Sequence, residues 1–360
     1  MDDLHRPNGI VSATDLLATE LEARGCEVEI WCFGRCDADF PQRHDVIAPV
    51  PGRRLTSHVP GFAASRRALK PVRYAASVVW WPWTAGRLRR LAARWDEDTL
   101  VIGAGLDSVR LLTQSGVRPA HLVSQVHLGV NRLSREQIGM VRGAATVSQA
   151  ITGLTADDAR ALRSYGIRAF AMANPAPTAP RADPTTSRTV VFLGRLSEVK
   201  QVDHLIRAFD ASAPAGWRLR VYGSGPEEER LRALADAARS DVELCGSVSD
   251  VGRVLQAAAI HVLPSRAEGL PMCILEANMA GVPTVAYDCA PGLGVAMGPS
   301  DLLLPLGDEE RLRSVLGDLM RDDAARGREG ERAYRYGQRF GAPAVVNAWT
   351  DLWNVLAAEA

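Results

Sequence analysis

The second half of the chain constrains the fold most, because it repeats a unit of strand, turn and helix. Residues 189–193 and 218–222 read as strands, and each runs into a turn that contains glycine. A segment with helical periodicity follows the first turn, near residues 202–211. Parallel strands need crossover connections, and helical crossovers cover the faces of the sheet. The repeat therefore predicts an α/β fold with a parallel sheet that carries helices on both faces.

The first half shows the same alternation less regularly. We expect a helix at 10–23 that Gly25 closes, and Thr155 should cap a further helix in a box with Asp158. The strand at 121–125 delivers His127 to its carboxyl end, where ligands of open α/β sheets bind. A role as an ordinary satisfied polar residue stays open for this histidine. The other expected elements are strands at 28–33 and 100–103 and a helix at 107–114.

A proline-rich stretch separates the halves, and 360 residues are enough for two cores. We predict an N-terminal domain at 1–175, a linker at 176–188 and a C-terminal domain at 189–335. Late helices are expected at 308–320 and 332–356.

The stretch from Pro264 to Asp288 carries the strongest chemical signal. It reads as a loop, then a helix that opens at Pro271, then a strand at 284–287. The amides of Met272 and Cys273 then point out of a positive helix end, which is a site for phosphate oxygens. Two amides at a helix start therefore predict an anion site.

Two carboxylates flank that anion site. Glu268 stands in the loop, and Glu276 follows after seven intervening residues, about one helical turn into the helix. Like charges repel, so a bare anion does not suit this arrangement. A nucleotide-sugar does, because its pyrophosphate lies between two hydroxyl-rich ends. The alternative is that both residues are solvated surface charges.

Cations precede this stretch at the end of the 189–193 strand. Gly194 and Arg195 open the turn and Lys200 closes it, so two cations flank the start of the next helix, where pyrophosphate oxygens can meet them. The later turn Gly223-Ser-Gly225-Pro226 allows close backbone approach, but it is not a dinucleotide fingerprint.

The frame Pro-Ser-x-x-Glu-Gly-Leu-Pro, followed by Leu-Glu-Ala-x-x-Ala-Gly-Val-Pro-Thr-Val, resembles the donor-site signature of family 4 retaining glycosyltransferases. The upstream frame Gly-Arg-Leu-x-x-x-Lys is similar to that family's phosphate-binding pair. The resemblance implies two doubly wound Rossmann-like domains facing across a cleft, the GT-B architecture. It also implies that residues 336–360 form a helix packing back on the N-terminal domain, with Trp349 and Trp353 as its anchor; core packing in the second domain is the alternative.

The same resemblance implies metal-independent, retaining transfer of a hexose from a nucleoside diphosphate sugar to an acceptor hydroxyl. UDP-sugars are favoured over GDP-sugars, and the sugar nucleotide is a co-substrate, so no cofactor is expected. Glu268 contacts the transferred sugar and Glu276 the ribose, while residues 244–250 meet the base. The expected catalytic residues are Glu268, His127, Arg195 and Lys200. The expected donor-binding residues are Gly9, Gly194, Gly225, Gly269, Leu270, Met272, Cys273 and Glu276.

Members of that family usually begin with an apolar strand that leads into a glycine loop at the position of Asn8-Gly9. This strand is missing here, so either the chain starts late relative to the natural gene product or residues upstream were removed. We expect an N-terminally extended form to be better folded. Asp37-Ala-Asp39 is a D-x-D triplet, the metal signature of another glycosyltransferase architecture, but it has no supporting frame and we expect no metal. The six cysteines show no paired C-x-x-C spacing and read as small core residues.

The charge of the chain and the pattern of its basic and aromatic residues limit the classes of partner that it can bind. Lys plus Arg and Asp plus Glu both number 42, which argues against nucleic acid. Residues 53–95 lack acids and mix arginines with tryptophans, which suits an anionic membrane surface; a basic outer helix face is the alternative. No apolar run is long enough to span a bilayer, so we expect a cytoplasmic enzyme, peripheral on the membrane.

The expected partners are a nucleotide-sugar and a glycan or lipid-linked acceptor, in the synthesis of cell-envelope polysaccharide, teichoic acid or glycolipid. Two other classes stay open. One is a nucleotide-sugar epimerase or phosphorylase of the same fold, and the other is a non-catalytic nucleotide-sugar-binding subunit.

Overall fold

The computed structural model describes residues 9–31, 45–47 and 82–359. The chain divides into two compact units, with boundaries after Ala173 and after Val345. The second unit is Asn174–Val345, and the first combines the N-terminal part with Val346–Ala360. Residues 176–188, expected as a linker, fall within the second unit. There the amide of Ala182 donates to the carbonyl of Ala280 at 2.8 Å.

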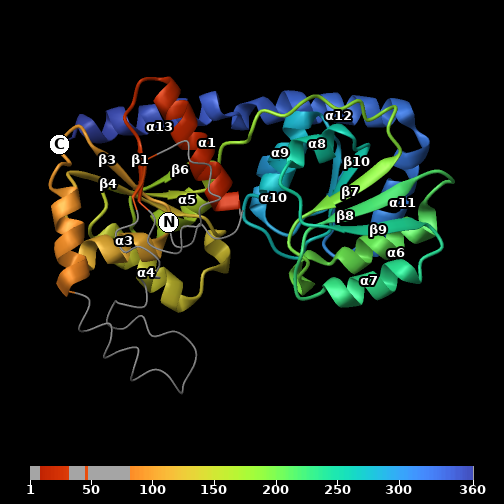
Figure 1. The fold of residues 1–360 in the computed structure, drawn as a ribbon, viewed down its shortest axis with the longest axis horizontal. Coiled ribbons are helices and arrows are strands. Elements are labelled where there is room, and N and C mark those ends of the chain that lie inside the picture. Colours follow the sequence, from red (N-terminus) through yellow and green to blue (C-terminus); the bar gives the residue numbers. More distant parts are fainter. Residues whose placement is uncertain (1–8, 32–44, 48–81, 360) are drawn as a thin grey trace, which may run out of the picture. The chain divides into compact units, whose positions relative to one another are not determined.

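The second unit holds a six-stranded sheet in the order β12-β11-β10-β7-β8-β9, and every pairing is parallel (Figure 1). The order reverses direction between β7 and β10, so the sheet is doubly wound, as predicted. The strands are β7 (Thr189–Leu193), β8 (Arg218–Tyr222), β9 (Asp241–Gly246), β10 (Ile260–Leu263), β11 (Thr284–Tyr287) and β12 (Leu303–Leu304).

Helices cover both faces of this sheet. One face packs on α8 and α9 through a cluster that includes Val191, Leu255 and Ala277, and α6 pairs with α11 on the other side (Figure 1). The helices are α6 (Val202–Ser212), α7 (Glu228–Asp236), α8 (Val251–Gln256), α9 (Met272–Ala280), α10 (Pro291–Met297), α11 (Glu309–Arg321) and α12 (Asp323–Gly337), with 3-10 turns η4 (Glu198–Lys200) and η5 (Gln338–Phe340). The predicted strands at 189–193, 218–222 and 284–287 are confirmed to the residue.

The first unit holds a four-stranded parallel sheet in the order β3-β4-β5-β6 and a two-stranded parallel sheet of β1 and β2. Its strands are β1 (Glu29–Trp31), β2 (Asp45–Ile47), β3 (Leu100–Gly103), β4 (His121–Val126), β5 (Ala150–Gly153) and β6 (Ala169–Ala171). Its helices are α1 (Gly9–Ala23), α3 (Leu106–Gln114), η3 (Val130–Arg132), α4 (Arg135–Ala145) and α5 (Ala156–Ser164), besides helical residues 82–92. The predicted capping box of Thr155 and Asp158 is confirmed.

The helix expected over 332–356 is wrong as a single element. Helix α12 ends at Gly337, η5 follows, and α13 (Ala342–Ala357) begins after Gly341, whose backbone is extended at ψ 148°. Pro343 cannot donate the amide hydrogen bond that a continuous helix needs there. The later part of α13 belongs to the first unit, where the Trp353 ring lies 4.8 Å from the ring of His121.

Several predictions lie outside the described residues: the Asp37-Ala-Asp39 triplet, Cys32, Cys36 and most of the basic segment 53–95. Among the helices that the structure describes, none is both long and apolar enough to cross a bilayer.

Candidate functional site

The site lies where the order of the second sheet reverses. Strands β7 and β10 are parallel neighbours, so their carboxyl ends meet at one edge and two loops leave from there, 194–201 and 264–271. The loops are joined: the amide of Arg266 donates to the carbonyl of Val199 at 2.9 Å, and the Arg266 guanidinium lies 3.0 Å from the Glu198 carboxylate. Ligands of open α/β sheets bind in this position.

An ion pair links the two loops at the site. Lys200 Nζ lies 2.6 Å from Glu268 Oε1, and the two side chains are 20% and 10% exposed. Burial is the largest single effect and lowers the pKa of Lys200, but the charge and hydrogen bond of Glu268, with smaller effects of Cys273 and Cys289, together outweigh it. The net pKa is therefore raised and the amine stays protonated. The sequence predicted a phosphate-binding cation and a sugar-binding acid, and the structure brings these two groups into direct contact.

Glu276 stands one turn into α9 as a half-buried carboxyl group. Burial raises its pKa to about 7. Within the described residues, no side chain or backbone group forms a hydrogen bond or ion pair with it. A buried carboxyl group without a partner is unfavourable in the free protein, so it is suited to accept hydrogen bonds from a ligand.

Helix α9 begins one residue later than expected. Pro271 precedes it with an extended ψ of 117°, and the first helical residue is Met272, so the prediction of Pro271 as the opening residue was wrong by one position. The amide of Ile274 donates to the Pro271 carbonyl at 3.1 Å. The amides of Met272 and Cys273 belong to the first turn and have no intrahelical acceptor. Leu270, which precedes this turn in the sequence, is buried at 5% exposure.

The thiol of Cys273 lies close enough to Lys200, Glu268 and Glu276 for all three to shift its pKa. Burial raises the pKa of this thiol to about 12, Lys200 acts in the lowering direction, and both Glu268 and Glu276 raise it further. The thiol is therefore neutral, and the three charged residues lie around the start of one helix. Lys200, Glu268, Cys273 and Glu276 form what we call the switch-point cluster.

Close backbone contacts hold the loops of this site together. A Cβ added to Gly223 would lie 1.8 Å from the Gly194 carbonyl oxygen, and one on Gly225 would lie 2.1 Å from that of Leu196. Likewise, a Cβ on Gly292 in α10 would lie 1.8 Å from the carbonyl oxygen of Gly269. This packing explains the glycines at 223, 225 and 292 without a ligand, and donor contacts of Gly194, Gly225 and Gly269 stay predictions.

Three further predicted site residues, Arg195, Gly9 and His127, are not part of the switch-point cluster. Arg195 is exposed, and its side chain has no ionic or hydrogen-bonding partner in the part of the chain that the structure describes. Gly9 is the first residue of α1, and His127 follows β4 at its carboxyl end; both belong to the first unit. The structure thus gathers Lys200, Glu268, Cys273 and Glu276, while the roles of Gly9 and His127 stay predictions.

Sequence reasoning missed His261. This residue lies in the middle of β10, is 0% exposed, and its Nδ1 lies 3.1 Å from Thr284 Oγ1. Burial lowers its pKa to about 3, with a further lowering by Lys200, so the ring is neutral. Its Nε2 has no hydrogen-bond partner among the described residues. The available signal was a histidine inside an otherwise apolar strand.

Comparison with known proteins agrees with this geometry. Residues 187–322 match the family described as glycosyl transferases group 1. An exopolysaccharide phosphotransferase of Streptomyces coelicolor is 39% identical over 178 residues, which are 48% of this chain and 19% of that protein. A poly(glycerol-phosphate) alpha-glucosyltransferase of Bacillus subtilis is 24% identical over 178 residues, 48% of this chain and 26% of that protein. The chain thus spans less than a third of the length of either relative.

A structural comparison covers nearly the whole chain. The crystal structure of Anabaena HepE in complex with UDP and glucose matches with a TM-score of 0.74 at 15% sequence identity, over 98% of each chain. The chain therefore has the GT-B fold of glycosyltransferases, which is built from Rossmann-like domains. Within that fold, residues 187–322 are the part that matches the group 1 glycosyl transferase family.

Proposed function

We propose that the protein is a retaining glycosyltransferase that moves a hexose from a nucleoside diphosphate sugar, preferably a UDP-sugar, to an acceptor hydroxyl. The observation that carries the proposal is the switch-point cluster: a protonated lysine, two acids and free helix-start amides at the carboxyl ends of β7 and β10, inside the part of the chain that matches the group 1 glycosyl transferase family. A nucleotide-sugar needs this combination, because its diphosphate requires donors and its ribose and sugar hydroxyls require acceptors.

The leaving diphosphate is stabilised by the amides of Met272 and Cys273 on one side and by Lys200 and Arg195 on the other. Arg195 is free to turn towards an anion, while Lys200 is already held in place by Glu268. Preorganised donors aimed at developing negative charge lower the barrier for departure of the nucleotide, so transfer proceeds without a metal ion.

The two acids take different parts of the donor. Glu276 accepts hydrogen bonds from the ribose hydroxyls, which gives its buried carboxyl group the partners that it lacks in the free protein. Glu268 accepts from the hydroxyls of the transferred sugar while it keeps Lys200 oriented. We keep His127 and Gly9, which belong to the first unit, as proposed site residues.

The acceptor is a hydroxyl of a cell-envelope glycan, teichoic acid or glycolipid. The names of the relatives support this choice, since one concerns exopolysaccharide and another poly(glycerol-phosphate). We place the reaction at the cytoplasmic face of the membrane, with segment 53–95 as the contact. In the described part of that segment, Trp83 is 50% exposed, with the Arg87 guanidinium 6.0 Å from its ring.

The roles of the two acids can be separated by substitution. Glu268→Gln keeps a hydrogen-bond acceptor for Lys200 but loses the charge, so we expect transfer activity to fall by more than about 100-fold while UDP affinity stays within a few-fold. Glu276→Ala should weaken UDP binding instead.

The matched control is Glu229→Gln, an exposed acid at the start of α7 with no charged partner among the described residues. It should leave both readouts unchanged. If Glu268→Gln and Glu276→Ala both retained wild-type turnover and UDP affinity, the assignment of this pair would be wrong.

A further inference from the structure

A basic pocket lies along α12, outside the switch-point cluster. Its volume is about 700 Å³, and four of its seven lining residues are arginines: Arg328, Arg332, Arg335 and Arg339. Glu331 is the acid among them, and it already pairs with Arg335 at 2.7 Å and with Arg181 at 2.9 Å. Glu329, next to the pocket in the sequence, pairs with Arg332 at 2.7 Å. The lining arginines without an acidic partner among the described residues are therefore Arg328 and Arg339.

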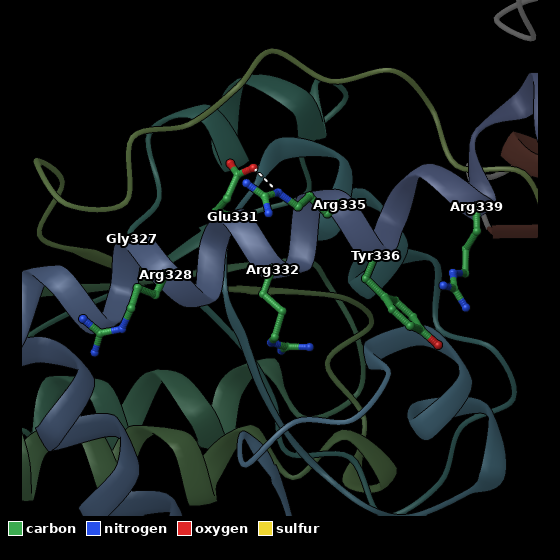
Figure 2. A pocket seen from close by; sticks show the side chains of 7 residues that line it. All are labelled: Gly327, Arg328, Glu331, Arg332, Arg335, Tyr336 and Arg339. Carbon is green, nitrogen blue, oxygen red and sulfur yellow. Dashed lines mark hydrogen bonds and ion pairs between the residues drawn. The ribbon is translucent and has the colours of Figure 1, made fainter.

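The side chains that face the pocket follow helical spacing. Figure 2 shows Arg328, Arg332, Tyr336 and Arg339 projecting to the same side of the helix, while the pair of Glu331 and Arg335 lies on the other. Positions four or three residues apart share one helix face. Three arginines are thus aligned in a row, and the two at its ends, Arg328 and Arg339, have no acidic partner among the described residues.

The middle of the row is fixed by hydrogen bonds. The Arg332 guanidinium donates to the carbonyls of Met297 and Pro299 at 2.9 and 3.2 Å and to Ser300 Oγ at 2.8 Å. The Tyr336 hydroxyl donates to the Val295 carbonyl at 3.1 Å. These bonds tie the end of α10 to α12, so the floor of the pocket is rigid.

The two ends of the row are free to bind. Arg328 is exposed, and its side chain forms no hydrogen bond or ion pair with any residue that the structure describes. Arg339 is also exposed, and its described contact is with the Tyr336 ring, whose centroid lies 4.0 Å from the guanidinium carbon. Eleven positions separate them, on the order of 16 Å at the rise of a helix. One phosphate cannot span that distance, but an extended anionic chain can.

We infer that this pocket binds a linear polyanion, in which Arg328 and Arg339 each bind an anionic group at one end of the pocket. A bilayer fits less well, because the exposed large hydrophobic side chains of the described residues, such as Leu306 and Val355, do not line the pocket. We take the polymer to be an acidic or phosphate-bearing glycan, and only this choice of polymer rests on the proposed function. The binding surface itself does not depend on catalysis.

The test is binding of oligogalacturonate, a linear acidic glycan, with neutral dextran as the uncharged comparison. The double variant Arg328→Ala with Arg339→Ala should bind oligogalacturonate at least about ten-fold more weakly than wild type. Its affinity should also depend less on salt concentration than the affinity of wild type does. The control Arg232→Ala with Arg253→Ala removes the same charge elsewhere in the second unit and should change affinity less than about two-fold.

Folding and the donor site are checked separately. UDP affinity and the melting temperature should be the same in all three proteins, because Arg328 and Arg339 lie outside the switch-point cluster; Gln variants at both positions replace the Ala pair if it fails to fold. Equal loss in both double variants would overturn the inference, as would oligogalacturonate that does not bind. Binding of single-stranded DNA or of phosphatidylglycerol vesicles in its place, lost in the Arg328 and Arg339 variant, would also overturn it. Failure of UDP to bind would instead count against the proposed function alone.

Discussion

The carboxyl group of Glu276 makes the second unit sensitive to pH. Its pKa rises from 4.5 to about 7 because burial in α9 disfavours the charged form. A shift of this size corresponds to about 3 kcal/mol between the two protonation states. Since the folded state holds the proton more tightly than the unfolded state, this contribution to stability is fully present below pH 4.5 and is lost as pH rises through about 7.

The variant Glu276→Gln removes this titration and keeps the size of the side chain. Without nucleotide, we expect wild type to lose more thermal stability than the variant between pH 5 and pH 8. Between these pH values, the free energy of unfolding of the variant should rise relative to that of wild type by up to about 3 kcal/mol. The assay is unfolding of both proteins, followed by fluorescence across that range. Glu229→Gln, at an exposed position, should follow wild type.

The affinity for nucleotide should depend on pH in the opposite direction to the stability. If ribose hydroxyls donate to an ionised Glu276, UDP affinity of wild type falls as pH drops below about 7, by up to about ten-fold for each pH unit. The variant shares every other titrating group, including the phosphates of UDP, and should lack this component. Identical pH profiles of stability and of UDP affinity in the two proteins would refute the reasoning.

Two further substitutions test how the site and the first unit are held. Gly292→Ala places a Cβ against the Gly269 carbonyl oxygen, so the loop with Glu268 must shift. We expect a loss of about 1–3 kcal/mol in stability, measured by melting, and weaker UDP binding, measured by calorimetry. Unchanged stability and UDP affinity would contradict the packing. Trp353→Ala removes the ring contact with His121 and should destabilise the first unit by about 2 kcal/mol, seen as faster hydrogen exchange in β4, while UDP affinity stays unchanged.

The sequence predicted much of the second unit, because local signals and the fold agree there. Apolar runs placed β7, β8 and β11 correctly, and Pro271 marked the start of α9 to within one residue. The break between α12 and α13 was missed, although Gly341 and Pro343 carry the signal, because the segments on both sides of it read as helical.

The geometry of the site could be predicted only in part. The motifs named Lys200, Glu268 and Glu276, but spacing along the chain could not show that Lys200 and Glu268 form an ion pair across two loops. The buried His261 was hidden in a strand where most positions are apolar. Contacts between segments far apart in the sequence depend on tertiary packing, which periodicity does not report.

Calorimetric titration with UDP, GDP and ADP, each with and without EDTA, tests the central claim most directly, namely that the second unit is a nucleotide-sugar donor site. We expect micromolar binding of one nucleotide, preferably UDP, that EDTA leaves unchanged and that Lys200→Ala weakens by about ten-fold or more. Binding of none of the three by the folded wild-type protein would contradict the account, and binding that requires a metal would contradict its metal-free donor site.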